Sequence, residues 1–233
     1  MIDNLLIENI KNVYRKISSA AIRSGRSPFD VKLVAVTKTV DLERIKDSIN
    51  LGLRVFGENK VQEAKEKILK LKEEVPDCEV EWHFIGHLQK NKAKTAVDLF
   101  DLIHSLDSLS LAGEVNKHAG KAGKIQRVLI EVKLSEEETK SGINKNNLMD
   151  LIGAVSGMKN LNLEGLMTIP PFFDDPDMAR PYFKELRGLR DKAGSAGYEL
   201  HELSMGMTND FEVAILEGAT IVRIGTAIFG ERR

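Results

Sequence analysis

The sequence predicts a single-domain (β/α)8 barrel of the TIM type, an α/β fold, with an extra helix before it. Short β-rich runs alternate strictly with helical stretches along the chain, and alternation of this kind favours a parallel sheet with helical crossovers. The length of 233 residues is close to the roughly 250 that such a barrel takes. An open doubly wound sheet is the alternative, but no G-x-G-x-x-G motif follows the first expected strand.

The elements follow from periodicity and from the residues that end each run. The opening helix spans residues 3–24, and Gly25 ends it. Its apolar positions are Leu5, Leu6, Ile10, Val13, Ile17 and Ala20 or Ala21. Strands are expected over 32–38, 54–58, 81–86, 102–106, 127–132, 163–168, 202–205 and 220–225. Helices are expected over 41–51, 60–74, 89–96, 108–121, 144–157, 176–193 and 208–217. No linker interrupts them, so we expect one domain over 1–233, with the leading helix in 1–25 and the barrel in 32–230.

Composition excludes several classes of protein. The formal net charge is −1, so no global field attracts nucleic acid or an acidic membrane. The single cysteine cannot form an internal disulfide, which fits a reducing compartment. The N-terminus does not read as a signal peptide, and no apolar run approaches the roughly 18 residues of a membrane span. We therefore expect a cytoplasmic protein with neither nucleic-acid nor membrane partners.

Lys38 is the most informative residue, because it ends the apolar run of the first expected strand. Charged side chains are seldom buried without a partner. One explanation is a salt bridge or a side chain that reaches to solvent. Another is that a desolvated lysine loses its charge and becomes an amine nucleophile toward an aldehyde.

Two loops at the other end of the sequence have the composition of a phosphate site. Residues 204–208 (SMGMT) and 223–226 (RIGT) follow or end the seventh and eighth strands, the usual place for phosphate in these barrels. Gly206 and Gly225 let backbone N–H groups approach an anion, while Ser204, Thr208 and Thr226 offer hydroxyl groups. The alternative is that these residues only cap a helix and make a turn.

The lysine and the loops together suggest one ligand. In a closed barrel the eighth strand lies beside the first, so an amine, a phosphate site and Arg223 would share one end of the barrel. Pyridoxal 5′-phosphate carries an aldehyde and a phosphate on a flat ring, and proteins bind it with a lysine imine and an Asp or Arg at the pyridine nitrogen.

Eight segments then match one known family in order. They are 34–38 (VAVTK), 56–59 (FGEN), 82–92 (WHFIGHLQKNK), 104–107 (HSLD), 139–142 (TKSG), 165–168 (GLMT), 203–208 (LSMGMT) and 223–230 (RIGTAIFG). The sequence closely resembles the pyridoxal-phosphate homeostasis proteins, barrel relatives of the N-terminal domain of alanine racemase.

The resemblance implies a set of cofactor contacts. Lys38 would hold pyridoxal phosphate as an aldimine, and Arg223 would face the pyridine nitrogen. Asn59 would flank the ring from the second strand. Met167 is a further candidate contact because it lies at the end of the sixth strand. The phosphate would contact Ser204, Gly206, Gly225 and Thr226. The family often has serine where Thr208 stands, which keeps the hydroxyl.

The expected function is a non-catalytic one: the protein would hold the cofactor and take part in its homeostasis. An arginine leaves the pyridine nitrogen unprotonated, which supports carbanion chemistry poorly. The sequence ends at Arg233, so we expect no racemase-type second domain, and Tyr14, Tyr182 and Tyr198 are expected in or beside outer helices. A pyridoxal-phosphate-dependent racemase is the alternative, and a lysine-imine enzyme of phosphorylated sugars is a third.

Partners and the remaining polar residues complete the expectations. Pyridoxal-phosphate-dependent apoenzymes are the expected recipients of the cofactor, and a monomer is the expected state. We expect no metal at His83 and His87, because a strand does not bring residues i and i+4 together. Lys140 would be either a second amine at the same end of the barrel or a solvated loop residue.

Overall fold

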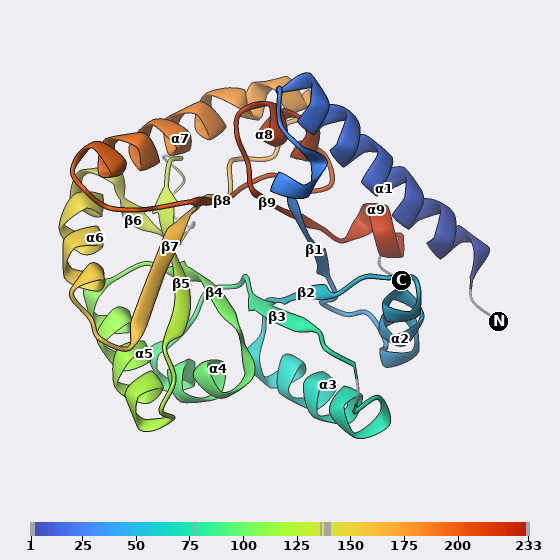
Figure 1. Ribbon diagram of the computed structural model, residues 1–233, viewed down its shortest axis with the longest axis horizontal. Coiled ribbons are helices and arrows are strands. Elements are labelled where there is room, and N and C mark those ends of the chain that lie inside the picture. Colours follow the sequence, from blue (N-terminus) through green and yellow to red (C-terminus); the bar gives the residue numbers. More distant parts are fainter. Residues whose placement is uncertain (1–2, 77, 136, 138–140, 232–233) are drawn as a thin grey trace.

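The strands of the computed structural model close into a barrel. The structure describes residues 3–76, 78–135, 137 and 141–231. Parallel pairing runs in the order β4-β3-β2-β1-β9-β8-β7-β5, and β4 also pairs with β5, which closes the ring (Figure 1). The strands are β1 (Lys32–Val36), β2 (Val55–Glu58), β3 (Glu81–Phe84), β4 (Leu102–Leu106), β5 (Gln126–Lys133), β7 (Leu161–Met167), β8 (Glu202–Ser204) and β9 (Ile221–Ile224). The predicted (β/α)8 barrel is therefore confirmed.

Helices surround the barrel, each covering the strands on either side of it. They are α2 (Leu42–Asn50), α3 (Val61–Glu74), α4 (Ala93–Leu99), α5 (Leu109–Lys121), α6 (Leu148–Ser156), α7 (Arg180–Ser195) and α8 (Phe211–Leu216). Side chains cap two of their N-termini: Asp41 accepts from the N–H of Arg44, and Ser108 from that of Leu111. All seven predicted crossover helices are present, within a few residues at each end.

Short elements account for the differences from prediction. The two-residue strand β6 (Ile143–Asn144) pairs with the end of β5 and was not predicted, nor was the short helix α9 (Thr226–Phe229). The expected helices over 89–96, 144–157 and 176–193 begin as 3₁₀ turns, η2 (Lys90–Lys92), η3 (Lys145–Asn147) and η4 (Pro176–Ala179). A further 3₁₀ turn, η1 (Pro28–Asp30), precedes β1. Strand β1 ends at Val36, so Lys38 lies in the following turn and not in the strand.

The helix α1 (Asn4–Arg23) packs on the side of the barrel against α8 and α9 (Figure 1). It buries Leu6, Ile10, Val13 and Ile17 as predicted, whereas Leu5, which was predicted on the same face, is 60% exposed. The Asn9 amide donates to the carbonyl of Ile228 at 3.0 Å, which ties the helix to the end of the barrel that follows β9.

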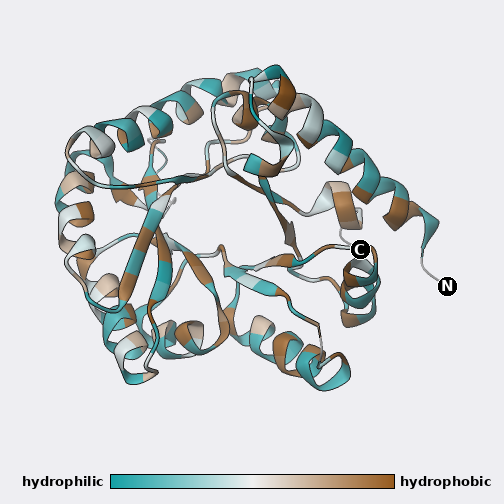
Figure 2. Ribbon diagram, in the orientation of Figure 1, coloured by the Kyte–Doolittle hydropathy of each residue, from teal (hydrophilic) through white to brown (hydrophobic). Residues whose placement is uncertain are grey.

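Two cores result from the alternation of side chains along the strands. The larger core lies between the strands and the helices, whose hydrophobic residues are interspersed with hydrophilic ones (Figure 2). The smaller core fills the barrel interior with Val34, Leu102, Leu129, Met167 and Ile221. No helix of the described residues is both long and apolar enough to cross a lipid bilayer.

Candidate functional site

Parallel strands place the ends of all strands on one rim of the barrel, here called the mouth. Lys38 lies two residues beyond β1, and Asn59 directly follows β2. Ser204 ends β8, and Arg223 lies on β9 one residue before its end. The remaining predicted cofactor contacts also lie at this end: Met167, Gly206, Gly225 and Thr226. The predicted residues thus share the end of the barrel where chemistry is expected.

The turn that carries Lys38 has an unusual backbone. Lys38 is half-buried, and the next residue, Thr39, has φ of 65°. Thr39 is the one non-glycine residue in the described ranges with a positive φ. A β-branched residue is strained in this conformation, so other contacts must hold it there.

Three side chains on the outer side of β1 and β2 supply those contacts, and we call Glu58, Glu63 and Lys67 the brace. Glu63 accepts the N–H of Thr39 at 2.8 Å, and Lys67 Nζ donates to the Thr37 carbonyl at 2.7 Å. Lys67 also contacts Glu58 and Glu63, each at 2.9 Å. The brace therefore fixes the backbone on both sides of Lys38.

Glu58 is the buried member of the brace. Its side chain is fully buried, and Thr37 Oγ1 donates to it at 2.8 Å. Burial raises the pKa of this carboxyl group, and the hydrogen bond from Lys67 opposes that rise. The FGEN segment pointed to Glu58, but nothing in the sequence pointed to Lys67.

The loop after β8 is built around Gly206. Its φ is 93°, and a Cβ atom there would lie 2.6 Å from Ala214 Cβ and 2.9 Å from Phe211 Cα. Glycine is therefore required for both conformation and space. The Gly206 carbonyl accepts the N–H of Arg223 at 3.0 Å, which joins this loop to β9.

The loop after β9 lies against both neighbours. A Cβ atom on Gly225 would be 3.3 Å from the Cβ and the carbonyl oxygen of Val36 on β1. Thr208 Oγ1 accepts the N–H of Ala227 at 3.4 Å, so the hydroxyl of the first loop reaches the second. The two loops and the end of β1 thus meet, as the phosphate-site prediction requires.

Arg223 supplies a buried positive charge at the mouth. Only 3% of it is exposed. Its guanidinium donates to Ser204 Oγ at 2.5 Å and to the Thr168 carbonyl at 3.0 Å, both neutral oxygens. Burial lowers the pKa of Arg223 to about 10, while the charges of Glu131 and Asp210 oppose that fall. The guanidinium is therefore charged at neutral pH.

Ser204 lies at the end of β8, as predicted, and its hydroxyl makes contacts inside the protein. The side chain is fully buried, and its hydroxyl lies between Arg223 and His104, whose Nδ1 is 2.8 Å away. The phosphate contact of Ser204 stays a prediction, and these hydrogen bonds favour a role in supporting Arg223. No sequence pattern indicated the contact with His104, because the two residues are 100 positions apart.

Glu131 is a mouth residue that sequence reasoning missed. It lies on β5, in register with Met167 on β7, and is 6% exposed. Burial raises its pKa to about 7, Asp107 adds to the rise, and Arg223 opposes it. Lys38 was identified because it is a charged residue in the apolar run of an expected strand. Glu131 has the same property, since it lies in the apolar run 128–132 (VLIEV), and could have been identified in the same way.

The histidines and tyrosines named in the sequence analysis are not among the predicted cofactor contacts. His83 is buried inside the barrel, whereas His87 is exposed near Asp107 and Ser141. Tyr14 lies in α1, Tyr182 in α7 and Tyr198 just beyond α7, as expected. Lys140 falls outside the described residues.

Comparison with known proteins gives consistent results. Residues 7–233 match the family model "Alanine racemase, N-terminal domain". A pyridoxal phosphate homeostasis protein from Aquifex aeolicus is 48% identical over 97% of this chain and 98% of its own. The protein of that name from Escherichia coli K12 is 40% identical over 98% of this chain and 97% of its own.

Solved structures agree with the sequence comparisons. PipY of Synechococcus elongatus PCC7942, in a structure with PLP bound, is 35% identical, with a TM-score of 0.81 over 94% of this chain and all of that chain. Alanine racemase from Corynebacterium glutamicum shares only the fold, at 18% identity and a TM-score of 0.69 over 98% of this chain and 61% of that one. With its mouth geometry and these near full-length matches, the chain belongs to the pyridoxal phosphate homeostasis protein family, within the alanine racemase N-terminal domain group.

Proposed function

We propose that this protein binds pyridoxal 5′-phosphate through the amino group of Lys38 and takes part in its homeostasis without catalysing a reaction. One observation carries the proposal. The pairing of β1 with β9 sets Val34 beside Arg223, so the turn of Lys38 and a buried arginine share one side of the mouth. An amine and a fixed cation on neighbouring strands suit a ligand with an aldehyde and an anionic group.

The residues at the mouth fit the phosphate group of this cofactor. Gly206 leaves no room for a side chain and Gly225 little room, so the backbone can approach the anion closely. Thr208 and Thr226 add hydroxyl donors from the two loops that meet there. Asp210 is already engaged as an acceptor of the Met207 N–H at 2.7 Å, which helps to set the shape of the first loop.

The position proposed for Arg223 favours binding of the cofactor without a reaction over cofactor-dependent catalysis. When bound, pyridoxal phosphate supplies an electron-withdrawing ring, and it does so most strongly with its pyridine nitrogen protonated. A cation such as Arg223 disfavours a proton at that nitrogen. We assign Arg223 this position at the ring, with Asn59 and Met167 lining it.

A second function has one observation in its favour. Glu131 is buried near Arg223 with a pKa of about 7, which suits a group that gains and loses protons near neutral pH. With Lys38 it would give the two acid–base groups that a racemase needs. The tyrosines of the chain are in or beside outer helices and supply no such group.

Homeostasis implies passing the cofactor on, and we propose pyridoxal-phosphate-dependent apoenzymes as recipients. We also propose a monomer in the cytoplasm. Direct transfer would make the release rate depend on the concentration of apoenzyme, whereas transfer through solution would not.

Spectroscopic titration with an activity assay tests the proposal. The wild type should develop a yellow band with pyridoxal phosphate, and Lys38→Ala should not. Lys60→Ala, which changes an exposed lysine directly after Asn59, is the matched control and should keep the band. Racemisation of alanine by the wild type that is lost in both Lys38→Ala and Glu131→Gln would favour the racemase instead.

A further inference from the structure

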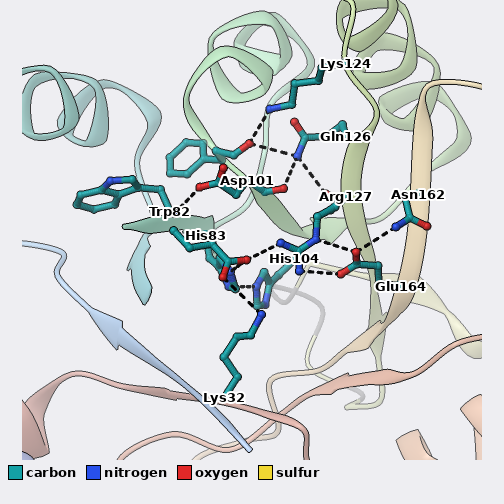
Figure 3. Close-up of polar contacts among 12 residues, drawn as sticks. Lys32, Trp82, His83, Asp101, His104, Lys124, Gln126, Arg127, Asn162 and Glu164 are labelled. Carbon is teal, nitrogen blue, oxygen red and sulfur yellow. Dashed lines mark hydrogen bonds and ion pairs between the residues drawn. The ribbon is translucent and has the colours of Figure 1, made fainter. Parts of the chain in front are cut away.

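A line of buried polar side chains runs through the barrel interior to Arg223, and Figure 3 shows its two histidines, His83 and His104. His83 on β3 and His104 on β4 are both fully buried. His104 Nε2 lies 2.9 Å from His83 Nδ1 (Figure 3). His104 Nδ1 lies 2.8 Å from Ser204 Oγ. Ser204 in turn contacts Arg223. The line therefore joins the middle of the barrel to the candidate site.

A group of ions at the opposite end of the barrel anchors this line. Glu81 Oε1 lies 2.9 Å from His83 Nε2, although the contact is poorly aligned for a hydrogen bond. Glu81 also pairs with Arg127 at 2.5 Å and with Lys32 at 3.5 Å. The contact with His83 and these cations hold the pKa of Glu81 well below its usual range, so it is a carboxylate that only accepts protons.

Both histidines are neutral, because burial lowers the pKa of His83 and lowers that of His104 further. The positive charges of Lys32, Arg127 and, for His104, Arg223 act in the same direction, while Glu81 opposes them at His83. A neutral imidazole has one donor nitrogen and one acceptor nitrogen.

The direction of every hydrogen bond then follows from Glu81. Because the carboxylate faces His83 Nε2, the proton of His83 is on Nε2 and its Nδ1 accepts. His104 must donate from Nε2 to that atom, so its Nδ1 accepts as well. Among the described residues, the partner of His104 Nδ1 is the hydroxyl of Ser204, which must therefore donate to it and leaves the Ser204 oxygen to accept from Arg223.

We propose that His104, held in one tautomer by His83 and Glu81, is a positioning residue for Arg223. It takes the only proton of Ser204, so that Ser204 presents a lone pair to the guanidinium and fixes its place at the mouth. This inference rests on the proposed function, in which Arg223 faces the cofactor ring. It also means that Ser204 has no proton left for a phosphate, which Thr208 and Thr226 would bind instead.

The test uses the full-length protein with pyridoxal phosphate and three variants. His104→Leu removes the acceptor, Ser204→Ala removes the link, and His104→Asn keeps an acceptor oxygen near the position of Nδ1. Leu102→Ala, two residues from His104 in the barrel interior, is the control for loosened packing alone. The readouts are the affinity for pyridoxal phosphate and the pH profile of the visible band.

We expect His104→Leu and Ser204→Ala each to weaken binding about three- to tenfold, the size of one neutral hydrogen bond, and to shift the pH profile. The double variant should be no worse than either single one, since both break the same line. His104→Asn should restore most of the affinity and the profile. A His104→Leu protein that behaves like Leu102→Ala would overturn the inference.

A second measurement needs no cofactor and so separates the inference from the proposed function. The ¹⁵N chemical shifts of the imidazole nitrogens in the free protein should show His83 and His104 as neutral, with the proton on Nε2. A proton on Nδ1 of His104 would overturn the inference even if the cofactor binds. Wild-type protein without a visible band, but with both histidines in the expected tautomer, would overturn the proposed function and the role at the ring while keeping the hydrogen-bond line.

Discussion

The carboxylate of Glu63, on helix α3, accepts the backbone N–H of Thr39 at 2.8 Å, one residue beyond Lys38. Thr39 has a φ of 65°, which a β-branched residue adopts only under constraint. The same carboxylate contacts Lys67, whose ammonium group also holds the carbonyl of Thr37. A helix outside the barrel thus sets the direction in which Lys38 leaves its strand.

The contacts of the brace predict that removing one of its side chains lowers the affinity for pyridoxal phosphate while the protein still folds. Glu63→Ala should weaken pyridoxal phosphate binding about three- to tenfold, because Thr39 loses the acceptor that holds its strained backbone. Glu63→Gln should lose less, since its amide oxygen can still accept the N–H. Affinity from spectroscopic titration and the urea midpoint of unfolding measure the two effects.

Glu66, exposed one turn away from Glu63 on the same helix, provides the control. Glu66→Ala should bind as the wild type does. If Glu63→Ala also binds as the wild type does, the brace has no part in positioning Lys38.

Glu131 predicts a particular dependence of stability on pH. Its pKa in the folded protein is about 7, above the 4.5 of a free carboxyl group. The folded state therefore binds the proton more tightly, and stability falls as pH rises from about 4.5 to about 7. The loss from this group is about 3 kcal/mol, since each pKa unit corresponds to about 1.4 kcal/mol.

Glu131→Gln removes that dependence. Urea unfolding at pH 5 and pH 8 should show the variant gaining about 2–3 kcal/mol relative to wild type between the two pH values. An unchanged difference at both pH values would mean that Glu131 titrates as an ordinary surface carboxyl group.

The phosphate loops predict a selective effect on phosphorylated ligand. Thr208→Val should weaken binding of pyridoxal phosphate by roughly tenfold, the size of a hydrogen bond to a charged group, and leave binding of pyridoxal unchanged. Ser204→Ala should weaken both ligands equally, because it acts through Arg223. Parallel titrations with the two ligands check this, and an equal effect of Thr208→Val on both would contradict it.

Much of the fold, and the positions of several site residues, could be predicted from the sequence because they depend on local or periodic patterns. The eight barrel strands and the buried face of α1 follow from apolar spacing, and the positions of Lys38, Gly206 and Arg223 at the mouth follow from strand ends. Glu131 could equally have been identified from the sequence, because it is a charged residue within an apolar run. The two-residue strand β6 was not, since it has too few residues to show a period.

The contacts that depend on closure of the barrel could not be predicted. His104 meets Ser204 across the interior, 100 positions away in the sequence, and that contact requires the closed barrel. Lys67 reaches back to Glu58 from the helix that follows β2, and that contact requires the way α3 packs on its own strand. Ser204 shows the consequence. Its place two residues before Gly206 in the sequence suggested phosphate, while its hydroxyl contacts His104 of β4 in the barrel interior.

Chemical trapping of the cofactor tests the central claim most directly. The protein would be mixed with one equivalent of pyridoxal phosphate, reduced with borohydride, digested and mapped by mass spectrometry. We predict one cofactor-derived label per chain, located on Lys38, and none in Lys38→Ala at the same equivalent. A label spread over other lysines, or equal labelling of wild type and Lys38→Ala, would contradict the assignment of Lys38 as the residue that holds the cofactor.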